Sequence, residues 1–255
     1  MLTLQSFPRG PQAAGNACEP YAWSDGAATC LNAPAGLVRI ISPQFTVYST
    51  ASDLENSNIF AAGAMPLGGL HWGAAAGWAR SESSPDTVQV AVIAARTVKG
   101  DPIGFMEGVF GPSISLGAGL GVTSTEDPPG GSRTMLSANA GFQFSVFPTV
   151  AVGADISGIR IMGDSLGERV FGFGFTSIFD KRFRGHYSLR NGTSSVGFDL
   201  DVSEWLTVRS GSDGSSWNSG VSFQGSWFSI DWAVVLNKVD CRQVLGIALY
   251  PGGGS

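Results

Sequence analysis

The chain has little charge, little lysine and no long apolar run. Charged residues make up 14% of its 255 positions, against roughly a quarter in an ordinary globular domain. Its lysines are Lys99, Lys181 and Lys238, and a solvated surface normally carries more of them. The net charge of −5 excludes nucleic acid as a partner, which would need a basic face. No apolar run reaches the ~18 residues of a transmembrane helix, so only strands could cross a membrane.

Residues for metal or cofactor chemistry are also scarce. His71 and His186 lie far apart and no C-x-x-C spacing occurs, so we expect no metal and no cofactor. Cys18 and Cys30 flank a short loop and would pair in an oxidising compartment, although three unpaired thiols fit equally well. The first ten residues lack the pattern of a secretory signal, and the terminal GGGS (252–255) resembles a linker.

What the chain has in abundance is period-2 alternation. In SISLGAGLGVT (113–123) the even positions are apolar and the odd positions are Ser, Gly or Thr. Fifteen such segments lie between residues 43 and 250, and the weakest is the Gly-rich stretch 103–110. A closed bacterial barrel needs an even number, so one of the fifteen is expected to be wrong.

Three features favour a membrane barrel over a soluble β-sandwich that binds a ligand. The segments are mostly as long as the ~9–11 residues of a tilted membrane strand. Their polar face is rich in Gly and Ser rather than Lys and Glu, which suits a crowded lumen. Aromatic residues gather near the segment ends, as interfacial girdles require. We therefore predict an all-β fold, a transmembrane antiparallel up-and-down barrel of about fourteen strands.

The stretch WSDGAATCLNAPAGL (23–37) is the exception to the alternation. Asp25 is placed to cap a short helix through Leu31, and Asn32, Pro34 and Gly36 are placed to end it. A compact segment before the first strand would fill part of a wide lumen. The sequence thus predicts a short helical plug, although a plain capping helix on a β-domain is an alternative.

The segment GNACEPYAWSDGAATCLNAPAGLVRI (15–40) resembles the entry segment of FadL-type outer-membrane transporters and, equally, that of PorV-type barrels of type IX secretion. The hairpin-like stretches 139–159 and 197–211 resemble strand pairs of the same barrels. The resemblance implies a Gram-negative outer-membrane protein, with residues 1–40 in the periplasmic mouth of a barrel formed by 41–251. It implies passive transport of small, hydrophobic molecules, or an accessory role that binds secreted or surface proteins. A transporter would show an apolar pocket or a lateral gap in the wall, and 103–111 is the expected place for the gap.

By strand parity, several polar side chains point into the lumen, where they would form an ion-pair network or line a water path. His186 and Ser188 are spaced as in a His–Ser catalytic pair, but their face points away from lipid, so we predict no enzyme. Asn191-Gly192 is better explained as a hairpin turn than as a glycosylation site. The predicted lumen-facing set is Asp155, His186, Ser188, Asp199, Asp201, Arg209 and Asp231.

Overall fold

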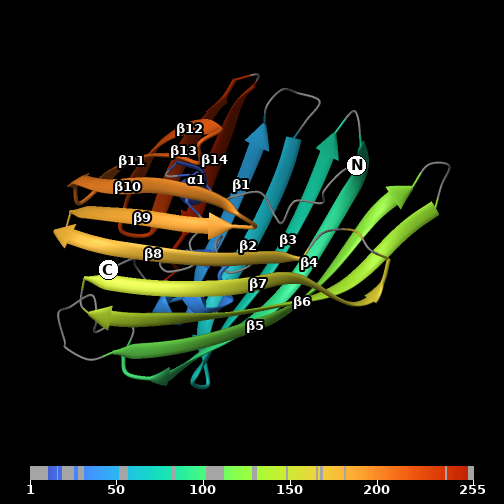
Figure 1. Cartoon of the computed structure of the whole chain (residues 1–255), viewed down its shortest axis with the longest axis horizontal. Helices are drawn as coiled ribbons and strands as arrows, with labels where there is room; N and C mark the ends of the chain where they lie inside the picture. The colour runs from blue at the N-terminus through green and yellow to red at the C-terminus, as the bar shows by residue number, and fades with distance from the viewer. Residues whose placement is uncertain are drawn as a thin grey trace.

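Fourteen antiparallel strands close into a single barrel in the computed structural model (Figure 1). Each strand pairs with its neighbour in sequence, and β1 pairs with β14 to complete the ring. The structure describes residues 11–15, 17–18, 26–27, 32–51, 57–81, 84–101, 112–127, 131–147, 149–164, 166, 169–180, 182–238 and 240–251. Its helical elements are α1 (Pro11–Gly15) and the 3-10 helix η2 (Pro34–Arg39). The strands are β1 (Gln44–Ala51), β2 (Ser57–Leu67), β3 (Leu70–Ser81), β4 (Ser84–Lys99), β5 (Ser113–Asp127), β6 (Gly131–Phe147), β7 (Val150–Gly163), β8 (Val170–Asp180), β9 (Phe183–Arg190), β10 (Thr193–Ser203), β11 (Leu206–Ser212), β12 (Ser216–Gln224), β13 (Phe228–Asn237) and β14 (Cys241–Leu249).

The ring closes with an even number of strands, as a membrane barrel requires. β4 pairs directly with β5, so the fifteenth segment predicted from the sequence has no place in the ring. That segment, 103–110, lies outside the described residues. The soluble β-sandwich alternative is wrong, because a sandwich needs two separate sheets and the described strands form one closed sheet. Within the described residues, no helix is long and apolar enough to span a bilayer.

The alternation predicted from the sequence separates the outside of the barrel from its lumen. On β5, the outward Leu116 and Leu120 are 51% and 55% exposed, whereas the inward Ser113 and Ser115 are 2% exposed. On β8 the outward Phe171 is 57% exposed. An apolar surface of this extent in contact with water would be strongly unfavourable, so it is the surface that faces lipid.

Aromatic side chains mark the end of the barrel where β1 begins and β14 ends, which we call the proximal end. Phe147, Phe179, Trp205 and Trp227 lie at its turns and are 62%, 70%, 57% and 60% exposed. The indole of Trp205 stacks on Phe223 with ring centroids 6.3 Å apart. Such rings favour the membrane–water interface, because one side contacts lipid and the other contacts headgroups.

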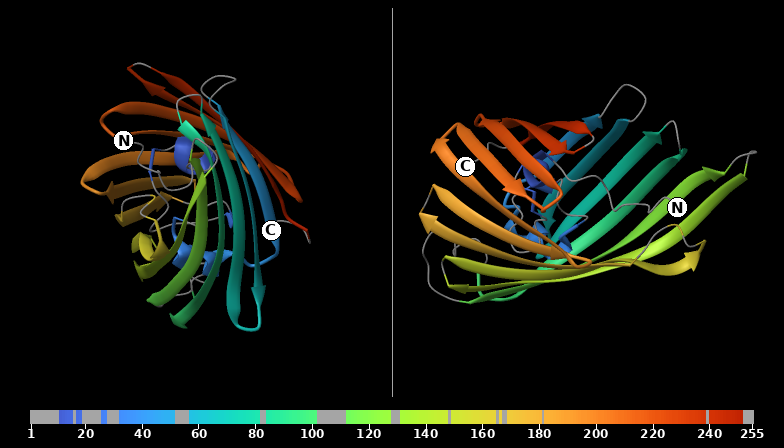
Figure 2. Two further views of the ribbon diagram at one scale, coloured as in Figure 1. Left: turned by 90° about the vertical axis from the view of Figure 1, so that its right-hand side faces the viewer. Right: turned by 45° about the horizontal axis from the view of Figure 1, so that its top comes forward.

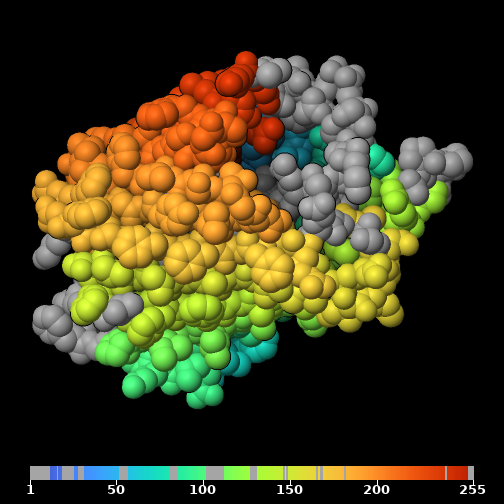
Figure 3. Space-filling model, in the orientation of Figure 1, coloured from blue at the N-terminus to red at the C-terminus, as the bar shows by residue number. Residues whose placement is uncertain are grey.

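The wall is taller on one side than on the other. β4 to β7 have 14 to 17 residues, whereas β8 to β14 have 7 to 11. The hairpin of β5 and β6 therefore projects past its neighbours at the opposite, distal end (Figures 1 and 3). The outward side chains near its tip, such as Glu126 and Thr134, are polar and exposed. The apolar belt thus ends below the tip, and the tip projects beyond it.

Candidate functional site

The described parts of the N-terminal segment lie inside the barrel, against two different walls (Figure 2). α1 contacts β11 to β14, and η2 contacts β3 to β6. Each helix thus covers part of the lumen on its own side of the barrel. The lumen and these two short helices together form the candidate site.

Glycines in the wall allow η2 to approach the sheet at backbone distance. A Cβ atom at Gly117 would lie 2.3 Å from the carbonyl carbon of Pro34, well inside van der Waals contact. A Cβ atom at Gly141 would lie 3.3 Å from Cγ of the same proline. η2 therefore packs directly on the small residues that the period-2 alternation places on the inner face of the wall.

Three groups at the proximal end bind η2 and the residue after it. The guanidinium of Arg39 donates to Oε1 of Gln143 and to Oγ of Ser145, each at 3.4 Å. Nδ1 of His71 lies 3.1 Å from the carbonyl oxygen of Ile40. Leu37, Val38 and Ile40 are at most 1% exposed. η2 is therefore held both by apolar burial and by these polar contacts.

α1 is seated on the opposite wall by a second glycine contact. A Cβ atom at Gly220 would lie 3.0 Å from Cα of Gly15, and Nδ2 of Asn218 donates to the carbonyl oxygen of Ala14 at 2.7 Å. Sγ of Cys18 then lies 3.6 Å from the carbonyl oxygen of His186 on β9. This wall of the barrel is lined mainly by polar groups.

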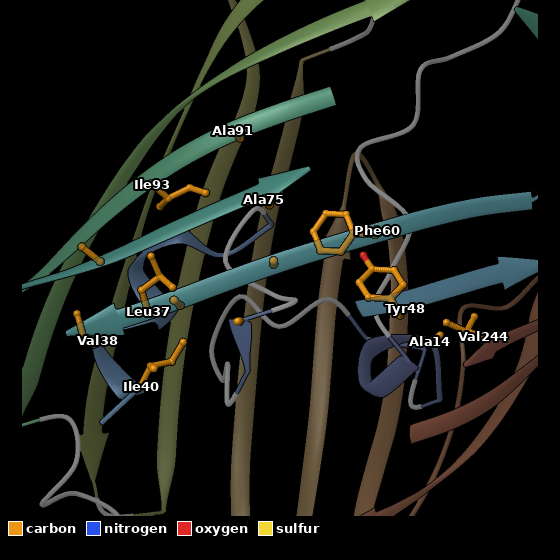
Figure 4. Packing of buried hydrophobic residues seen from close by; sticks show 14 of the residues in the cluster. Ala14, Leu37, Val38, Ile40, Tyr48, Phe60, Ala75, Ala91, Ile93 and Val244 are labelled. Atoms are coloured by element: carbon orange, nitrogen blue, oxygen red, sulfur yellow. The ribbon is translucent and has the colours of Figure 1, made fainter. Parts of the chain in front are cut away.

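An apolar stripe runs between the two helices on β1, β2, β4 and β14. It consists of Tyr48, Phe60, Ile93 and Val244, all at most 2% exposed, together with inward alanines of the same wall. The rings of Tyr48 and Phe60 are tilted against each other with centroids 4.5 Å apart. Figure 4 shows Leu37 and Ile40 near one end of the stripe and Ala14 beside Val244 at the other. The stripe is an apolar surface inside a lumen that is otherwise lined by polar and small residues.

A polar ladder crosses the opposite wall from β8 to β13. We use this name for Thr176, His186, Asp199, Arg209, Ser222, Asp231, Ser229 and Tyr250. In its first half, Nδ1 of His186 is 3.1 Å from Oγ1 of Thr176, and Nε2 is 3.2 Å from Oδ2 of Asp199. Nε of Arg209 lies 3.6 Å from Oδ1 of Asp199, and Nε of Arg184 lies 3.8 Å from Oδ2. Asp199 therefore faces two arginines and a histidine.

The second half of the ladder continues the chain of contacts without a break. Oγ of Ser222 accepts from Arg209 and donates to Oδ1 of Asp231. Oδ2 of Asp231 accepts from Oγ of Ser229 at 3.1 Å, and that hydroxyl lies 3.1 Å from the hydroxyl of Tyr250. Apart from the Ser229–Asp231 contact within β13, each contact joins adjacent strands or the end of the chain, so the ladder links the strands of this wall.

No family model and no curated protein matches this sequence. Solved structures do match. The toluene transporter TbuX of Ralstonia pickettii is 11% identical over 97% of this chain and 100% of its own, with a TM-score of 0.67. The toluene transporter TodX of P. putida is 9% identical over 95% and 98%, with a TM-score of 0.62. A Pseudomonas aeruginosa FadL homologue is 12% identical over 94% and 98%, with a TM-score of 0.62.

The chain has the FadL-type barrel fold. The fold expected from the resemblance is therefore confirmed over nearly the whole chain, although identities of 9% to 12% carry the fold alone. Two of these solved structures are described as transporters and none as an enzyme.

Within this FadL-type barrel, the predicted lumen-facing residues fall into two groups. His186, Asp199, Asp201, Arg209 and Asp231 come together on one wall, and Nη2 of Arg184 lies 3.2 Å from Oδ1 of Asp201. The other two lie apart from the ladder: Asp155 on β7 is 6% exposed and Ser188 on β9 is 1% exposed. The ring nitrogens of His186 face Thr176 and Asp199, so the geometry does not present His186 as a base for Ser188.

The predicted lumen-facing set left out Thr176, Ser222 and Ser229 of the ladder, the neighbouring Arg184, and Tyr250. The first four share the inward parity of the predicted residues, so the signal was present in the alternation. Tyr250 lies just beyond β14, where no parity applies. Among the described residues, no group of three His, Cys, Asp or Glu is arranged to hold a metal ion.

The predicted stop at Asn32, Pro34 and Gly36 stays a prediction, because residues 28–31 before it lie outside the described residues. Pro34 begins the helical element η2 rather than only ending one, and Gly36 lies within it with its N–H bound to the carbonyl oxygen of Ala33. Proline suits a first helical turn, because its φ is preset and no N–H is needed there. Asp25 and Cys30 lie outside the described residues, so the helix cap and the Cys18–Cys30 pairing stay predictions.

Proposed function

We propose that this chain is an outer-membrane channel for the passive transport of small hydrophobic molecules. In this proposal residues 41–251 form the channel wall and residues 1–40 form its plug. The solved neighbours support it, because two of them are described as toluene transporters. The accessory role in secretion gains no support from the fold and stays a prediction.

The observation that carries the proposal is the apolar stripe. A channel for ions or sugars would be lined by polar groups all round, because burying a polar solute against carbon costs free energy. Here the inward Phe60, Ile93 and Val244 are apolar and at most 2% exposed, and they share one buried cluster with residues of the plug, so a solute would reach the stripe when the plug moves aside. A hydrophobic solute that leaves the lipid would regain apolar contact at the stripe, so its transfer into the lumen would cost little free energy.

The plug helices are bound in a way that permits release. η2 rests on Gly117 and Gly141. Its Arg39 donates to Gln143 on the wall, and the carbonyl oxygen of Ile40 lies beside the ring of His71. Alanines and a few aliphatic side chains make up its apolar contact. η2 is a 3-10 helix that takes no place in the hydrogen-bonded ring of strands, so we assign gating to the N-terminal segment and a fixed, structural role to the polar ladder.

We place the proposed lateral route between lipid and lumen at the distal end, where β7 and β8 cease to pair. β7 pairs with β8 only as far as Ser157 and Val170, whereas β7 continues to Gly163 along β6. Gly158, with φ of +69°, bends the strand at that point. The predicted place for such a gap, 103–111, lies outside the described residues.

The test is uptake of radiolabelled toluene by Gram-negative cells that produce the chain, with a disaccharide as the polar reference. The proposal expects toluene uptake to rise over cells with the empty vector while disaccharide uptake stays unchanged. Phe60→Asp and Ile93→Asn put polar groups into the stripe and are expected to reduce toluene uptake. Val92→Asn changes the neighbouring outward position and is the matched control.

Two outcomes would contradict the channel. Equal uptake of toluene with and without the chain would remove the transport function. A rise in disaccharide uptake as large as the rise in toluene uptake would point to a general pore, in which the stripe has no role.

A further inference from the structure

Two basic side chains lie on the lipid-facing side of β4 near the proximal end. The inward residues of this strand are Ile93 and Ala95, which are 1% and 2% exposed. Arg96 follows Ala95, is exposed, and pairs with Leu116, whose side chain is 51% exposed on the outside of β5. Arg96 therefore points away from the lumen.

A β-bulge brings Lys99 to the same side. Thr97 pairs with the inward Ser115, but Lys99 pairs with Ile114, so one residue between them is extra. Without the bulge, alternation would place Lys99 on the face of Thr97, toward the lumen. Gly100, directly after Lys99, has φ of +75°, and a Cβ there would lie 2.4 Å from the carbonyl oxygen of Pro112. The bulge thus puts both cations on the lipid-facing side of β4.

The outward side chains near this pair on β2 to β4 are mainly apolar, and the exposed Asp101 follows two residues after Lys99. Trp72 on β3 and Leu67 at the end of β2 are 40% and 64% exposed, and Val98 is 61% exposed. Across the described residues, neither Arg96 nor Lys99 forms a salt bridge or a side-chain hydrogen bond, in contrast to Arg39, Arg184 and Arg209 inside the barrel. Cations on the lipid face of a barrel are destabilising unless they reach the interface.

We propose that Arg96 and Lys99 bind the phosphate of an anionic phospholipid in the leaflet at the proximal end. The inference rests on the proposed function to the extent that it requires a membrane-spanning barrel. A phosphodiester offers the charge and the acceptor oxygens that both side chains lack within the protein. Leu67, Trp72 and Val98 would contact the acyl chains of the same lipid. A net negative headgroup fits two cations better than a zwitterionic one.

The test measures lipid bound to the purified chain in detergent by native mass spectrometry. Phosphatidylglycerol is titrated in, and phosphatidylcholine is the zwitterionic reference. Each basic residue near an anionic lipid contributes on the order of a fivefold gain in affinity, so the double variant Arg96→Gln, Lys99→Gln is expected to bind phosphatidylglycerol about thirtyfold more weakly. Each single variant is expected to lose about fivefold, which keeps the test usable if the double variant does not fold.

The matched control, Arg80→Gln with Lys238→Gln, removes the same charge from the distal end. Unchanged affinity of the double variant for phosphatidylglycerol overturns the proposal. An equal loss of affinity in the control also overturns it, because the net charge of the chain would then account for binding. Inorganic phosphate that binds in lipid-free detergent with the same dependence on Arg96 and Lys99 overturns the phospholipid as the ligand. A normal lipid result with no toluene uptake would count against the channel and leave the lipid site standing.

Discussion

Substitution of Gly117 by alanine should push η2 away from the wall of the barrel. The new Cβ would lie 2.3 Å from the carbonyl carbon of Pro34 and 2.5 Å from the amide nitrogen of Ala35. Carbon atoms pack at about 3.5–4.0 Å, so η2 must move by about 1 Å or more. Both colliding groups are backbone, and no rotamer change relieves them. Overpacking of this kind typically costs about 1–3 kcal/mol.

Gly121→Ala is the matched control on the same face of the same strand. A Cβ there would meet Cβ of Ala91 and the carbonyl oxygen of Val90 at 3.4 Å, which is ordinary contact. We expect Gly117→Ala to lower the free energy of unfolding in urea by about 1–3 kcal/mol more than Gly121→Ala. Folded barrel is scored by its faster migration in unboiled gel samples.

Displacement of η2 should also widen the passage on the side of β3 to β6. Toluene uptake in cells is therefore expected to be higher for Gly117→Ala than for the unmodified chain, and unchanged for Gly121→Ala. If the two variants are equally stable and transport equally, the close approach of η2 to Gly117 has no energetic consequence, and the assignment of η2 as a releasable plug is refuted.

Three further substitutions test the ladder and the turns. Asp199→Asn removes the carboxylate that Arg184, Arg209 and His186 share, while Asp201 and Asp231 still pair with the two arginines, so unfolding in urea should become easier by about 1.5–3 kcal/mol. In the β11–β12 turn, burial alone would raise the pKa of Asp213, but hydrogen bonds from Ser215 and Ser216 outweigh it and lower that pKa. The ionised Asp213 therefore contributes its full stabilisation above the ordinary aspartate pKa of about 3.9, and this stabilisation is lost as the pH falls through the lower pKa of the folded state. In urea unfolding measured at decreasing pH, Asp213→Asn should not show this loss of stability. Gly192→Ala, at φ of +86° with open space around it, should cost roughly 1 kcal/mol through backbone strain alone, and a thermal melt that matches the unmodified chain would contradict this.

Much of the barrel wall could be predicted from the sequence because alternation is a local property. Fourteen of the fifteen predicted segments correspond to strands, and the Asn191-Gly192 turn is confirmed with φ of +45° and +86°. The same parity placed Asp199, Arg209 and Asp231 on the inner face. Local stop signals were less informative, since Pro34 and Gly36 suit the inside of a 3-10 helix as well as the end of a longer one.

The sequence by itself determined which side chains of each strand point outward or inward, and that the outward surface is apolar and carries little charge. Only the tertiary structure decided which inward glycines act as contacts for the plug, because Gly117, Gly121 and Gly220 all lie at inward positions of their strands. The decisive contacts join residues far apart in the chain, such as Ala14 with Asn218. The outward direction of Lys99 was likewise invisible, since it depends on a bulge that only the register with β5 reveals. Alternation sets a side chain's face, but the closure of the ring determines what that face meets.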